Sequence, residues 1–141
     1  MLVRLLYASR AATGVDADAL NLILKQSKAN NPALGVTGVL CYSGGLFMQA
    51  LEGGRGAVNR LYNRICADPL HSEVELLSYE EITERRFAGW AMGQANLAQL
   101  NPALLLKYSE TEALDPYAMS GPVALALFEE LVATASVCGR G

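Results

Sequence analysis

The sequence predicts an α+β fold in which two helices cover one face of an antiparallel sheet. Segments of alternating apolar residues are interleaved with stretches whose apolar residues recur at helical spacing, and their order is β-α-β-β-α-β. That order is typical of a ferredoxin-like sandwich, whose first and third strands lie side by side in the centre of the sheet. An added fifth strand and two C-terminal helices complete the predicted fold.

The strands are indicated by alternation and by turn residues. In the first strand, Val3, Leu5 and Tyr7 share one face. The second and third strands flank a Ser-Gly-Gly turn, which is typical of a hairpin. We expect the strands at residues 2–8, 36–42, 46–52, 73–82 and about 90–96.

The helices are indicated by apolar residues at steps of three and four. We expect Pro32 to end the first helix near Asn30, because proline disfavours the helical conformation in the residue before it. The expected helices, with their apolar stripes or caps, are 15–30 (Leu20, Ile23, Leu24), 56–68 (Val58, Leu61, Ile65), one that follows the cap Asn101, and 120–135 (Val123, Leu127, Leu131).

Composition narrows the classes of function. The net charge of −3 and the pI near 5.1 argue against nucleic acid as the main partner. The three cysteines are widely spaced and there is a single histidine, so we predict no metal site. No stretch approaches the roughly 20 apolar residues of a membrane span, and the N-terminus lacks a secretory core. We therefore expect a cytoplasmic protein with no membrane partner.

Polar residues fall on the inward faces of several predicted elements. Gln49 lies between Phe47 and Leu51 on the face of the third strand that should be apolar, and Tyr7 of the neighbouring strand faces the same way. The stripes of the first two helices also become polar towards their C-terminal ends. The polar residues at these ends are Ser27, Asn30, Asn31, Arg64 and Asp68.

These polar groups converge on one location, which favours a ligand. A buried amide without a partner costs about 1–3 kcal/mol. A flat heteroaromatic ring with donors and acceptors along its edge, such as the isoalloxazine of a flavin, would satisfy several amides together. Ile23, Leu24 and Phe47 would supply its apolar walls.

Each of these features also has an ordinary structural explanation. An inward tyrosine often bonds to backbone, and an inward glutamine often bonds to a neighbouring strand or to water. Two asparagines before a proline often mark a helix stop, and the pair Arg64 and Asp68 would usually be a surface ion pair. Trp90 and Met92, on one face of the fifth strand, would usually be core residues.

The sequence contains the segments YASRA at 7–11, NNPALGVTGVLCYSGGLFMQALEG at 30–53, RICADPLH at 64–71 and RRFAGWAMG at 85–93. Together these four segments resemble the BLUF domain, a blue-light sensor that uses flavin. The resemblance implies a photosensory domain over residues 1–97 and a C-terminal helical extension over 98–141. The tail, LKYSETEALDPYAM, is similar to that of the short, stand-alone PixD-like members of the family.

The resemblance also implies roles for individual residues. Tyr7 matches the tyrosine that gives an electron and a proton to the excited flavin, and Gln49 matches the glutamine that bridges this tyrosine and the flavin. Asn31 matches the asparagine bonded to the ring. Ser27, Asn30, Arg64, Asp68 and His71 fall on positions that line the ring or its side chain, and Trp90 and Met92 on positions that relay the signal. The sequence departs from the family at Leu70, where arginine is common.

On this resemblance we expect a blue-light photoreceptor that binds a flavin non-covalently and is not an enzyme. Transfer from Tyr7 would rearrange the hydrogen bonds of Gln49 and shift the absorption to the red, and the change would pass to a downstream effector protein in trans. FAD is the expected cofactor, with FMN as the alternative, and the apolar tail favours a homo-oligomer. The competing hypotheses are a flavin-dependent oxidoreductase, for which no GxGxxG follows the first strand, and a ligand-free interaction module with the same fold.

Overall fold

The computed structural model describes residues 1–12 and 17–139, with the backbone alone at 17–19, so the predicted start of the first helix at Val15 or Asp16 lies outside the described residues. The strands are β1 (Leu2–Ala11), β2 (Thr37–Ser43), β3 (Leu46–Gly54), β4 (His71–Ile82) and β5 (Gly93–Asn96). The helices are α1 (Ala17–Leu34), α2 (Arg55–Ala67), α3 (Pro102–Leu106) and α4 (Gly121–Ala133), with short 3₁₀ helices η1 (Leu97–Gln99) and η2 (Pro116–Ala118). The predicted α+β, ferredoxin-like order with an added strand and C-terminal helices is confirmed.

The sheet has the order β4-β1-β3-β2-β5, so the first and third strands are neighbours as predicted. In their antiparallel register Tyr7 lies directly opposite Gln49. The predicted hairpin is also confirmed, because Gly44 and Gly45 have φ values of 54° and 79°, as a tight two-residue turn between strands requires. The sequence predicts an antiparallel sheet. The fifth strand instead runs parallel to β2, so the sheet is mixed.

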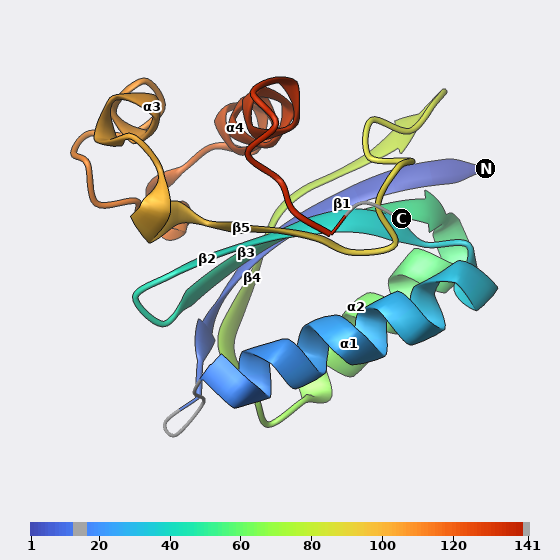
Figure 1. Cartoon of the computed structure of the whole chain (residues 1–141). Coiled ribbons are helices and arrows are strands. Elements are labelled where there is room, and N and C mark those ends of the chain that lie inside the picture. The colour runs from blue at the N-terminus through green and yellow to red at the C-terminus, as the bar shows by residue number, and fades with distance from the viewer. Residues whose placement is uncertain (13–16, 140–141) are drawn as a thin grey trace.

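Helices lie on both faces of the sheet. Figure 1 shows α1 and α2 together on one face and α4 across the other. The core under α1 and α2 includes Val3, Leu5, Leu24, Leu51 and Val58. None of the helices described within residues 1–12 and 17–139 is long and apolar enough to cross a membrane.

The C-terminal helix α4 shares a core with the sheet. Leu127 and Leu131 of its predicted stripe are fully buried, whereas Val123 is half-buried. Ala124 and Phe128 complete the buried face of α4. On the sheet side this core includes Leu6, Val39, Met48 and Ala50. The tail therefore covers the second face of the sheet.

The first helix does not end at its proline, contrary to the prediction. It continues through Pro32 to Leu34 and stops at Gly35, whose φ is 70°. The Gly35 N–H donates to the Pro32 carbonyl at 3.2 Å and the Val36 N–H to the Asn31 carbonyl at 3.0 Å. This pair of bonds is a Schellman motif, and it satisfies the last carbonyls of the helix. The glycine that permits this closure, and not the proline, sets the end of α1.

The fifth strand is shorter than predicted, because Trp90 and Met92 precede it. The Trp90 N–H bonds to the Phe87 carbonyl at 3.2 Å, which closes a turn, and the Ala91 carbonyl accepts from the Asn31 side chain at 2.8 Å. The Trp90 carbonyl accepts the Gly38 N–H of β2 at 3.0 Å, but the regular β2–β5 pairing starts only at Gly93.

Candidate functional site

A cleft opens between α1, α2 and the face of the sheet that these helices cover. It encloses about 880 Å³ of empty space, part of which is open to solvent. Its lining residues are Tyr7, Ile23, Gln26, Ser27, Asn30, Asn31, Leu34, Leu40, Phe47, Gln49, Leu61, Arg64, Ile65, Asp68, His71 and Met92. The cleft combines apolar walls with amide, hydroxyl and charged groups, which is the composition of a small-molecule site.

Three side chains form a series of hydrogen bonds at the sheet side of the cleft. The Tyr7 hydroxyl donates to Gln49 Oε1, and Gln49 Nε2 donates to Met92 Sδ at 3.1 Å. Tyr7 and Met92 are each 1% exposed and Gln49 is 6% exposed. The central position of β1 and β3 in the sheet places Tyr7 beside Gln49, so the series follows directly from the strand order.

The Tyr7 hydroxyl is held in its protonated form. Burial raises its pKa well above the usual range, and the neighbouring Cys66, Tyr62 and Asp68 add smaller effects in the same direction. A protonated phenol is a hydrogen-bond donor, which matches its bond to Gln49. The Tyr7 ring also packs against the Tyr62 ring, with the two ring centroids 5.7 Å apart. Burial and a hydrogen bond with Cys66 raise the pKa of Tyr62 to about 12.

The last turns of α1 carry polar groups to the cleft. Ser27, Asn30 and Asn31 all line it, and Asn31 is 2% exposed. Asn31 Nδ2 donates to the Ala91 carbonyl at 2.8 Å, which ties the helix to the segment before β5. Because α1 continues to Leu34, Asn31 lies inside the helix and its direction is fixed by helical geometry.

His71 closes the cleft beside the start of β4. Its Nδ1 lies 2.9 Å from the Ser9 hydroxyl, and its ring packs at 5.3 Å from the Phe47 ring. Burial lowers the pKa of His71, and the Asp68 carboxylate opposes this effect more weakly. The histidine is therefore neutral near pH 7, so this wall of the cleft is polar without carrying a positive charge.

Most residues predicted for the site line the cleft together. They are Tyr7, Ile23, Ser27, Asn30, Asn31, Phe47, Gln49, Arg64, Asp68, His71 and Met92. Leu24 does not, because it lies one residue around the helix from Ile23 and is buried in the core under α1. Trp90 does not either, because it packs against the core on the opposite face of the sheet, which leaves Met92 as the residue that contacts Gln49.

Sequence reasoning missed several lining residues, which are Gln26, Leu34, Leu40, Leu61 and Ile65. Three of them carried a signal. Leu40 alternates onto the cleft face of β2, opposite Gln49 in the register, and Leu61 and Ile65 lie on the predicted apolar stripe of α2. Leu34 gave none, since the helix was expected to end before it.

Comparisons with known proteins agree with one another. A family model described as BLUF, sensors of blue-light using FAD, matches residues 2–93. The photoactivated adenylate cyclase subunit beta of Euglena longa is 36% identical over 95 residues, which are 67% of this chain and 11% of that protein. The blue light- and temperature-regulated antirepressor BluF of Escherichia coli (strain K12) is 31% identical over 87 residues, 62% of this chain and 22% of that protein. The chain thus spans about a tenth to a fifth of the length of these relatives.

Solved structures match over nearly the whole chain. BlsA in its photo-activated state matches with a TM-score of 0.84 at 28% identity, and the match covers 94% of this chain and 95% of the BlsA chain. BlrB, a BLUF protein in its dark state, has a TM-score of 0.80 at 34% identity and covers 95% of this chain and 96% of its own. By its sequence, its fold and the family model over most of its length, the chain belongs to the BLUF family of flavin-binding blue-light sensors.

Proposed function

We propose that the chain binds a flavin non-covalently in the cleft between α1 and α2 and reports blue light through the hydrogen bonds of Gln49. The observation that carries the proposal is the series Tyr7–Gln49–Met92 in the wall of the cleft. FAD is the proposed cofactor, as in the description of the family.

The residues of the cleft fit a flavin. The amides of Asn30 and Asn31 can each donate and accept, which suits a ring edge that carries an N–H beside a carbonyl. Ile23 and Phe47 offer apolar surface for the faces of the flavin ring, and Arg64 offers a cation for the polar chain that the flavin ring carries. These features support the assignment of the predicted site residues.

A bound flavin supplies blue-light absorption and, once excited, a one-electron oxidant. Tyr7 is the proposed electron donor, because its phenol is oxidisable and lies in the wall of the cleft. Its hydroxyl proton already points to Gln49 Oε1, so loss of the electron and loss of the proton can occur together. When both return to Tyr7 there is no net redox change, and only the arrangement of hydrogen bonds differs.

Gln49 is the proposed site of the lasting change. Rotation of its amide by half a turn would bring Nε2 to the Tyr7 oxygen and Oε1 to Met92 Sδ. A thioether sulfur accepts hydrogen bonds but donates none, so Met92 would lose its bond to Gln49. Met92 directly precedes β5, which makes it the proposed link between the cleft and the rest of the sheet.

The test compares two tyrosines that lie in contact. Tyr7→Phe removes the hydroxyl that bonds to Gln49, whereas Tyr62→Phe removes a hydroxyl from the ring packed beside Tyr7. We expect both variants to bind flavin, and we expect the light-minus-dark absorption spectrum to lose its red shift in Tyr7→Phe alone. A normal shift in Tyr7→Phe removes Tyr7 from the mechanism. Colourless protein after flavin-replete expression overturns the proposal itself.

We propose further that the segment from residue 98 on passes the change to an effector protein in trans, and that the chain forms a homo-oligomer. Relatives support an effector role for this family, since one is a photoactivated adenylate cyclase subunit and the name of another calls it an antirepressor. Mass spectrometry of the extracted flavin distinguishes FAD from FMN. Light scattering of the protein in darkness and under blue light measures the oligomeric state and its response.

A further inference from the structure

The segment between β4 and β5, residues 83–92, joins the cleft to the opposite face of the sheet. At its end Met92 accepts a hydrogen bond from Gln49 at 3.1 Å. Nearer its start the Phe87 ring packs edge-to-face against Phe128 of α4, with centroids 6.0 Å apart. The position of this segment therefore decides both how Met92 meets Gln49 and how α4 lies on the sheet.

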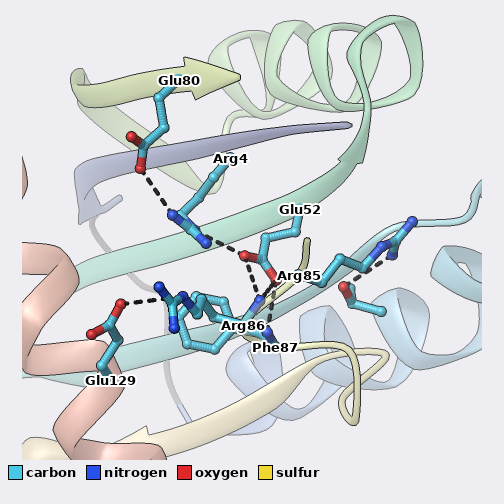
Figure 2. Close-up of polar contacts among 8 residues, drawn as sticks. Arg4, Glu52, Glu80, Arg85, Arg86, Phe87 and Glu129 are labelled. Carbon is cyan, nitrogen blue, oxygen red and sulfur yellow. Dashed lines mark hydrogen bonds and ion pairs between the residues drawn. The ribbon is translucent and has the colours of Figure 1, made fainter. Parts of the chain in front are cut away.

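A buried carboxylate of β3 holds the first half of this segment. Glu52 is fully buried, and it accepts the Phe87 N–H at 2.7 Å and the Arg86 N–H at 3.0 Å (Figure 2). Arg4 of β1, 4% exposed, donates to the same carboxylate at 2.8 Å and also to Glu80 of β4 at 2.9 Å. The carboxylate thus joins two backbone donors of the segment to a cation fixed between strands.

Hydrogen bonds continue from this carboxylate along the segment as far as Trp90 and the neighbouring strand β2. The Phe87 carbonyl accepts the Trp90 N–H at 3.2 Å, and the Trp90 carbonyl accepts the Gly38 N–H of β2 at 3.0 Å. Met92 follows Trp90 by two residues, so its contact with Gln49 lies just beyond a short series of hydrogen bonds that begins at Glu52.

We infer that Glu52 is a positioning residue for the light response, because it places the 83–92 segment so that Met92 meets the Gln49 amide. The inference rests on the proposed function for the role of Gln49, but the position of Met92 can be measured without light. Gln49 and Glu52 lie on the same strand and face opposite sides of the sheet, one towards the cleft and one towards the segment. Glu52 needs no contact with the cofactor for this role.

The test uses two changes at Glu52 and two controls. Glu52→Asp keeps the charge beside Arg4 but withdraws the carboxylate by one methylene from the Arg86 and Phe87 N–H groups. Glu52→Gln keeps the length but replaces an acceptor oxygen with an NH₂ donor. Glu80→Gln removes the other carboxylate on Arg4, which has no bond to the segment, and Val3→Ala removes buried methyl groups elsewhere in the sheet.

The first measurement is the NMR shift of the labelled Met92 methyl and of the Gly38 amide, in the dark and well below the unfolding temperature. We expect both signals to move in the two Glu52 variants and to stay in place in Glu80→Gln and Val3→Ala. A loss of stability alone leaves these shifts unchanged in folded protein, so Val3→Ala separates positioning from a merely structural role. Unchanged Met92 and Gly38 signals in folded Glu52→Asp, the variant that keeps its charge paired, overturn the inference.

The second measurement is the rate at which the light-induced spectrum returns in darkness. With Met92 displaced, we expect this rate to change about tenfold in the Glu52 variants and less than about twofold in the two controls, since removal of a buried hydrogen bond to a charged group has an effect of this size. An unchanged rate with a displaced Met92 separates Glu52 from the light response and overturns its positioning role. Absence of any light-induced shift in the wild-type protein overturns the proposed function instead, and the dark NMR comparison still decides whether Glu52 positions Met92.

Discussion

Truncation of one aromatic residue on α4 tests whether the C-terminal helix and the sheet form a single folding unit. Phe128 is fully buried and packs edge-to-face against Phe87, with ring centroids 6.0 Å apart and planes at 65°. Replacement of a buried phenylalanine by alanine costs about 3–5 kcal/mol, and the lost aromatic pair contributes to that cost, so we expect about 4 kcal/mol for Phe128→Ala. A domain of this size has a total stability of about 5–15 kcal/mol, so the effect is large.

The assay is urea denaturation followed by two signals. Circular dichroism reports the helices, and fluorescence reports Trp90, the single tryptophan, which packs against the core shared by α4 and the sheet. We expect one transition by both signals, with its midpoint lowered in Phe128→Ala. The control is Val123→Ala on the same helix, which is half-buried and should cost about 1 kcal/mol. A loss below about 1 kcal/mol for Phe128→Ala, or separate transitions for the two signals in the wild-type protein, would refute a common core.

Two further predictions concern pH and backbone conformation. Burial lowers the pKa of His71, the single histidine, so below about pH 6.5 the unfolded chain binds a proton that the folded protein does not. The free energy of unfolding should therefore decrease as the pH is lowered through about 6.5. His71→Gln should lack this part of the decrease in urea titrations, and an unchanged pH dependence in the variant contradicts the assignment. Gly35→Ala should cost about 1 kcal/mol in the same assay, because φ is 70° at this position. Gly35→Asn should cost less, since asparagine tolerates this conformation better. Equal stability of the wild-type protein and the two variants argues against the helix closure described for α1.

Strand alternation was sufficient to predict the centre of the site. The period of two placed Tyr7 and Gln49 on one face, and the ferredoxin-like strand order made them neighbours, as their register confirms. Helical spacing likewise predicted that the ends of α1 and α2 bring Ser27, Asn31 and Arg64 to the same cleft. These predictions succeeded because each depended on a periodic property of one element and on a common strand order.

Predictions that depended on the ends of elements were less successful. Proline was read as the end of α1, but an interior proline costs a helix one hydrogen bond, and the Schellman closure at Gly35 offsets this loss. The early start assigned to β5 placed Trp90 and Met92 on one strand face, whereas the turn at Phe87 and Trp90 directs them to opposite sides of the sheet. In both cases the deciding bonds join residues that no periodic pattern relates.

Glu52 is another residue whose hydrogen-bond partners could not be predicted from the sequence. Gln49 attracted attention because it is polar on a face that should be apolar, and Glu52 meets the same criterion on the opposite face of β3, beside Met48 and Ala50. Burial of a charge without partners costs more than burial of an amide, so Glu52 was the stronger indication that partners exist. Those partners are Arg4 and the backbone N–H groups of residues 86 and 87. Nearly every residue type has a backbone N–H, so the residue types do not show which of them will donate. A carboxylate on a buried strand face therefore predicts that hydrogen-bond partners exist, but the structure is needed to show that residues 86 and 87 supply two of them.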